Sequence, residues 1–145
     1  MIKTEKEYKA MVLRLREDLQ FIDHQKGLLE KTSLSDEEIK RAMEPAITFH
    51  EQLKEEVEYY EKIKRFEFGA ILNLSELGKT LIGLRIAIGM SQAQLAESLG
   101  GSEAQVSRDE KNEYHGISVE RAHRILEALN ITLVSTVERL PSKIA

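Results

Sequence analysis

Apolar residues in the first part of the chain recur every three or four positions, which is the spacing of one helix face. The first stripe consists of Tyr8, Val12, Leu15, Leu19 and Ile22. The second stripe consists of Ile39, Met43, Ala46, His50, Leu53, Val57 and Tyr60. Residues 31–34 between the stripes are typical of a turn, so residues 4–65 are predicted to form a helical hairpin.

Both helices of this hairpin begin at a recognisable start signal. Thr4 is followed three residues later by Glu7, and Ser35 by Glu38, which is the spacing of a capping box. Pro45 falls inside the second stripe, where it should either kink the helix or sit in the first turn of a new one.

A second module of short helices is predicted after a linker at residues 66–75. Its first three helices are expected at residues 76–88, 92–99 and 103–111, with Gly89 and Gly100 at the helix ends. A fourth helix is expected after Ser118, with Val119, Ala122, Ile125, Leu126 and Leu129 facing inward. Ser91, Ser102 and Ser118 are suited to cap the helices that follow them.

In the C-terminal tail, apolar residues follow an alternating pattern in place of the helical spacing, and many of the residues are β-branched. Residues 131–137 alternate as Ile-Thr-Leu-Val-Ser-Thr-Val, which predicts a short strand. A lone strand needs a partner, so we expect it to pair with its copy in a second subunit or with another chain. The chain is thus divided into a hairpin at 1–69 for dimerisation or partner binding, a helical module at 70–130, and a C-terminal strand and tail at 131–145.

Composition and charge exclude several classes of protein. The chain has 145 residues, a net charge of −4 and no cysteine, which excludes disulfides and thiolate metal sites. Residues 70–130 hold six Lys and Arg against eight Asp and Glu. Non-specific affinity for a phosphate backbone should therefore be weak. The N-terminus lacks the apolar run of a signal peptide, and no stretch approaches the ~18–20 apolar residues of a membrane span, so a cytoplasmic protein is expected.

The informative motif lies between residues 84 and 110. It contains Leu-Arg at 84–85, Gly-Met-Ser-Gln at 89–92, Leu-Ala at 95–96, Leu-Gly at 99–100 and Ser-Arg-Asp-Glu at 107–110. Two capped helices joined by a glycine turn are typical of a helix-turn-helix. The segment from about 77 to 130 closely resembles the Xre/Cro–CI family of regulators. This resemblance implies a mainly α fold with a lambda-repressor-like helix-turn-helix domain and binding to double-stranded DNA. The lone strand at residues 131–137 and the small positive charge of one such domain further predict a homodimer that binds an inverted-repeat operator.

The resemblance also implies roles for particular residues. Gln92 stands where the family holds a phosphate at the start of the second helix. The third helix would enter the major groove with Ser102, Glu103, Ala104, Gln105, Ser107 and Arg108 on its reading face. A glutamine can bond adenine, an arginine guanine, and a glutamate can accept from cytosine.

Inside the domain, the resemblance implies a buried structural ion pair between Arg85 and Glu110. Two residues depart from the family pattern. Gly101 stands where a branched apolar residue is usual, and Asp109 stands where an apolar residue commonly packs. Both departures concern helix packing.

The hairpin and the tail strand together are similar to HigA-like antitoxins of the Xre branch, which bind a toxin and repress their own operon. This similarity predicts an autoregulating repressor with a cognate toxin as a further partner. A prophage-type repressor without a toxin remains open, as does a protein-interaction adaptor whose helix-turn-helix does not bind DNA. The sequence has no catalytic motif, no metal-ligand spacing and no cofactor signature, so we expect neither enzyme activity, metal nor cofactor.

Overall fold

The computed structural model describes residues 1–142 and contains two compact units, Met1–Ala70 and Ile71–Ala145. The last residues of the predicted tail, 143–145, lie outside the described residues.

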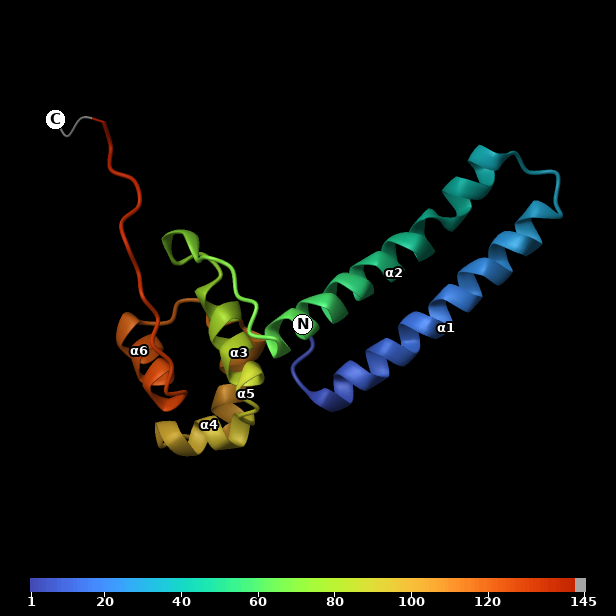
Figure 1. Ribbon diagram of the computed structural model, residues 1–145. Coiled ribbons are helices and arrows are strands. Elements are labelled where there is room, and N and C mark those ends of the chain that lie inside the picture. Colours follow the sequence, from blue (N-terminus) through green and yellow to red (C-terminus); the bar gives the residue numbers. More distant parts are fainter. Residues whose placement is uncertain (143–145) are drawn as a thin grey trace. The chain divides into compact units, whose positions relative to one another are not determined.

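The first unit is a hairpin of two long antiparallel helices (Figure 1). Helix α1 spans Glu5–Glu30 and α2 spans Asp36–Lys64. The side chain of Thr4 accepts a hydrogen bond from the backbone N–H of Glu7, and Ser35 does the same for Glu38. Both predicted helix starts are therefore confirmed.

Helix α2 continues through Pro45 as one element. Of the two alternatives expected for Pro45, a new helix beginning there is therefore excluded. A proline removes one backbone donor, but Met43 and His50 are buried on either side of it. Side-chain packing outweighs the cost of one missing hydrogen bond at this point.

Two tyrosines join the helices near the open end of the hairpin. The rings of Tyr8 and Tyr60 stack with centroids 4.9 Å apart. The Tyr8 hydroxyl donates to Glu61 at 2.8 Å, and the Tyr60 hydroxyl donates to Glu5 at 3.1 Å. Burial and the bond to Glu5 raise the pKa of Tyr60 to about 12, which keeps this hydroxyl a donor.

The second unit packs four short helices and a 3₁₀ turn, η1, at Leu72–Leu74 (Figure 1). Their bounds are α3 Leu77–Ala87, α4 Gln92–Leu99, α5 Glu103–Lys111 and α6 Val119–Ala128. The side chains of Ser91, Ser102 and Ser118 cap α4, α5 and α6, as predicted. Only Ser91 completes a full capping box, with Gln94.

Helix α3 is the centre of this unit, because every residue from Leu81 to Ala87 is buried. Leu95 of α4, Val106 of α5 and Ile125 of α6 are buried as well. Val119, which was expected to face inward, is 81% exposed. It occupies the first position of α6, where the chain has not yet turned toward the core.

A close backbone approach explains the glycine at position 78. A Cβ atom built on Gly78 would lie 1.8 Å from the carbonyl oxygen of Glu113.

Because the obstacle is backbone, Gly78→Ala should lower the free energy of unfolding by about 1–3 kcal/mol. Thermal melting checks this. A Cβ on Gly101 meets nothing within 4 Å, so Gly101→Ala is the matched control and should be neutral or slightly stabilising. Equal melting temperatures for the two variants would contradict the argument.

The predicted C-terminal strand is absent from the described part of the tail. Residues 131–142 form no helix or strand and run on in an extended path from α6 (Figure 1). Val134 and Val137 are 78% and 81% exposed. β-branched residues favour strands through packing against neighbouring strands, and the described residues of this helical unit supply none. The strand prediction is therefore wrong for this chain.

Candidate nucleic-acid interface

Helices α4 and α5 are joined by a tight turn with glycine at its first position. Gly100 has φ of 70°, a left-handed conformation that costs glycine little. Its N–H and that of Gly101 bond back to Glu97 and Ala96 and close the end of α4. Open space surrounds Gly101, so the turn needs no apolar side chain there. The arrangement is a helix-turn-helix.

Helix α5 presents two different faces. Val106 and Glu110 are buried and point into the unit. The six residues predicted for the reading face are all exposed, namely Ser102, Glu103, Ala104, Gln105, Ser107 and Arg108. The structure thus brings this predicted set together on the solvent-facing side of α5, from its N-cap to its last turn.

The buried face of α5 is fixed by an ion pair to α3. Nε of Arg85 lies 2.5 Å from Oε1 of Glu110, and Nη2 lies 2.9 Å from Oε2. A third Arg85 nitrogen, Nη1, donates to the carbonyl of Met90 at 2.7 Å. The two charged side chains are 4% and 0% exposed. This two-point contact sets the angle between α3 and α5.

Gln92 is part of the same buried arrangement. Its Nε2 donates to Oε2 of Glu110 at 2.6 Å, and its side chain is half-buried at the start of α4. A glutamine amide has two hydrogens, so one is still available for a phosphate. Glu110 of the ion pair therefore also orients Gln92, which the family resemblance assigns to a phosphate of the DNA backbone.

The exposed edge of α5 carries a second hydrogen-bonded chain. Nη2 of Arg108 donates to Oε1 of Gln105 at 2.9 Å, and Nε2 of Gln105 donates to Oδ1 of Asp109 at 2.8 Å. Arg121, from α6, donates to Oδ2 of Asp109 at 2.9 Å. The two expected base readers are thus bonded to each other and, through Asp109, to α6.

Asp109 was expected only as a departure from the family pattern, and Arg121 was not among the predicted site residues. The i,i+4 spacing of Gln105 and Asp109 is a signal that could have been used. Nothing local points to Arg121, which lies twelve residues further along the chain. An ion pair takes the place of the apolar contact expected at position 109.

Most cations of this unit have partners in the described residues. Arg85 and Arg121 are in ion pairs, and Lys79 pairs with Glu76. Arg124 donates to the carbonyl of Leu99 at the end of α4. Lys111 is exposed in the last turn of α5. Only a small positive charge is thus left for phosphate contacts from α5 and α6.

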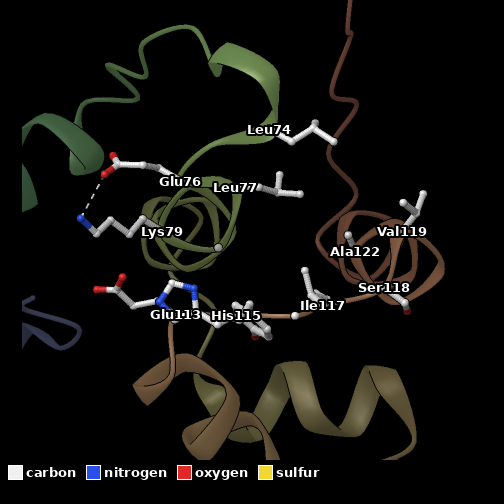
Figure 2. Close-up of a pocket in the computed structure, with 13 residues that line it drawn as sticks. Leu74, Glu76, Leu77, Lys79, Glu113, His115, Ile117, Ser118, Val119 and Ala122 are labelled. Atoms are coloured by element: carbon white, nitrogen blue, oxygen red, sulfur yellow. Dashed lines mark hydrogen bonds and ion pairs between the residues drawn. The ribbon is translucent and has the colours of Figure 1, made fainter.

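A shallow hollow lies beside Gly78, away from the predicted reading residues. Figure 2 shows Leu77, Ile117 and Ala122 on one side of it and the Glu76–Lys79 ion pair with Glu113 and His115 on the other. Its volume of 340 Å³ is at the lower end for ligand sites. Tyr114 also lines it, and burial is the main reason that the pKa of this phenol is raised.

Residues 1–142 contain no cluster of three His, Cys, Asp or Glu side chains placed to hold a metal ion. In the same part of the chain, every helix is too short or too polar to traverse a lipid bilayer.

Comparison with known proteins supports the helix-turn-helix assignment. Residues 81–135 match the helix-turn-helix family model, which covers less than half of the chain. No curated protein and no solved structure gives a significant match. The matched segment comprises most of α3, all of α4, α5 and α6 and the first residues of the tail. It leaves out the hairpin. This match indicates a helix-turn-helix domain at residues 81–135, similar to that of Xre and lambda-repressor proteins, and such a domain suggests a DNA-binding regulator.

Proposed function

We propose that this protein is a sequence-specific repressor that binds double-stranded DNA as a homodimer on an inverted repeat. The observation that carries the proposal is the two-faced helix α5. Its exposed face holds Gln105 and Arg108, whose side chains can bond base edges in the major groove. Its buried face is held by the ion pair of Glu110 with Arg85.

The homodimer is proposed because one helix-turn-helix has little charge with which to hold DNA. In α5 and α6, the cations outside ion pairs are Arg108, Lys111 and Arg124. Each phosphate contact contributes about 0.9 to the slope of the logarithm of affinity against the logarithm of salt concentration. Two copies double the number of such contacts, and an inverted repeat lets both copies make the same ones.

The test is selection from a pool of duplexes with a randomised core of about 20 base pairs. The full-length protein should enrich one inverted repeat with half-sites about 10 base pairs apart. The matched control is the double variant Gln105→Ala, Arg108→Ala, which should lose this enrichment while retaining the melting temperature. Failure of the unaltered protein to enrich any sequence would contradict the proposal and favour the adaptor role.

An antitoxin role is the second candidate, and the hairpin favours it. Phe21, Ile47 and Phe49 are 58%, 43% and 47% exposed on this separate unit. Large exposed apolar side chains on one unit are candidates for a protein contact where they form a contiguous patch. If the neighbouring gene encodes a toxin, replacing Phe21 and Phe49 by serine should abolish its neutralisation and leave DNA selection unchanged. Neutralisation that survives these changes would contradict this role for the hairpin.

A further inference from the structure

The contacts of Asp109 suggest a role beyond helix packing. This side chain lies at the edge of the α5 reading face and is 23% exposed. One oxygen accepts from Gln105 and the other from Arg121. Both oxygens of the carboxylate are therefore engaged, and its charge is neutralised by a guanidinium on another helix.

These contacts determine which way the Gln105 amide points. Its oxygen accepts from Arg108, and its nitrogen donates to Asp109. Asp109 can only accept and Arg108 can only donate, so the reverse orientation of the amide would lose both bonds. Each end of the amide retains one further hydrogen-bonding position, because the nitrogen has a second hydrogen and the oxygen a second lone pair.

Amide orientation matters for base choice. Adenine offers a donor at N6 beside an acceptor at N7, and a glutamine bonds both only when its oxygen and nitrogen face them in the right order. A glutamine whose amide oxygen and nitrogen are fixed in one orientation favours one base pair over the others. An amide free to turn over can bond the edges of several bases.

We infer that Asp109 is a positioning residue that sets the base preference of Gln105, and that Arg121 holds Asp109 in place for this purpose. The inference rests on the proposed function, because it assigns the specificity of that same DNA-binding face. It also explains why an acidic side chain is tolerated next to a surface that would meet phosphates.

The experiment compares Asp109→Ala with Glu97→Ala. Both variants remove one negative charge from the same unit, but Glu97 is exposed on α4 and lies outside the hydrogen-bonded chain. The probes are the sequence that the unaltered protein selects from the randomised pool, its single-base variants and an unrelated duplex. Thermal melting of each variant checks that it folds.

Asp109→Ala should reduce the preference for the selected base about tenfold at one position in each half-site. Its affinity for the unrelated duplex should stay the same or rise, as for Glu97→Ala, because a negative charge is lost. A purely structural role for Asp109 would instead weaken binding to all duplexes alike and lower the melting temperature.

Asp109→Asn provides the second readout. Its carbonyl oxygen can still accept from Gln105, whereas its amide cannot bond Arg121 as the carboxylate does. The base preference of this variant should therefore lie between that of the unaltered protein and that of Asp109→Ala. The inference is overturned if Asp109→Ala keeps the base preference within twofold, or if Asp109→Asn loses as much as Asp109→Ala. If the unaltered protein selects no sequence, the proposed function itself fails, and this inference fails with it.

Discussion

Replacing Glu110 by alanine is expected to lower the free energy of unfolding of the unit Ile71–Ala145 by about 3–5 kcal/mol. The change leaves the guanidinium of Arg85 buried without its carboxylate, and a buried unpaired charge is costly. Gln92 loses its acceptor at the same time. Thermal or denaturant unfolding measures the loss. A melting temperature equal to that of the unaltered protein would show that the ion pair contributes nothing to stability.

The double variant Arg85→Met, Glu110→Met is the control for this prediction. Replacing both partners of a buried ion pair by apolar residues of similar size is often close to neutral. The double variant should therefore be more stable than Glu110→Ala. A double variant as unstable as the single one would show that helix packing, and not the unpaired charge, dominates the loss.

Replacing Arg108 by alanine should weaken binding to the selected sequence by about 1–3 kcal/mol for each half-site, or about 2–6 kcal/mol for a dimer. Arg108 is exposed at the beginning of the last turn of α5, and its guanidinium can bond a guanine edge with two donors. Competition binding against single-base variants of the selected sequence measures both the loss and its position.

Lys111→Ala is the matched control, because it removes one exposed cation from the last turn of the same helix. Loss of a cation that contacts only phosphate is expected to weaken binding to all duplexes alike. It should also reduce the slope of log affinity against log salt concentration by about one. If Arg108→Ala behaves in this way too, Arg108 binds the backbone and does not read a base.

The polar residues that cap helices made much of this fold predictable from the sequence. The serines at 91, 102 and 118 each cap a helix, and the bounds of α4 and α5 agree with those expected from the sequence. Capping depends on a residue and its third neighbour, so it is encoded locally. The exposed set on α5 came instead from the resemblance to the Xre/Cro–CI family, and helix periodicity agrees with it because Val106 and Glu110 are the buried residues of that helix.

Other features depend on contacts that local patterns do not contain. The link from Asp109 to Arg121 joins two helices, and Gly78 is required by the distant carbonyl of Glu113. The tail was predicted as a strand from its β-branched residues. β-branched residues suit a strand only where a neighbouring strand packs against them, and the composition of the tail does not show whether such a strand exists.

The division of the chain into the units Met1–Ala70 and Ile71–Ala145 has a consequence for heat denaturation. Each unit has its own buried residues, so each can lose its structure in its own cooperative transition. A calorimetric trace of the full chain can then contain two endotherms, and the total enthalpy will exceed the van't Hoff value of either. Substitutions at Gly78 and Glu110 should displace one endotherm and leave the other at its original temperature.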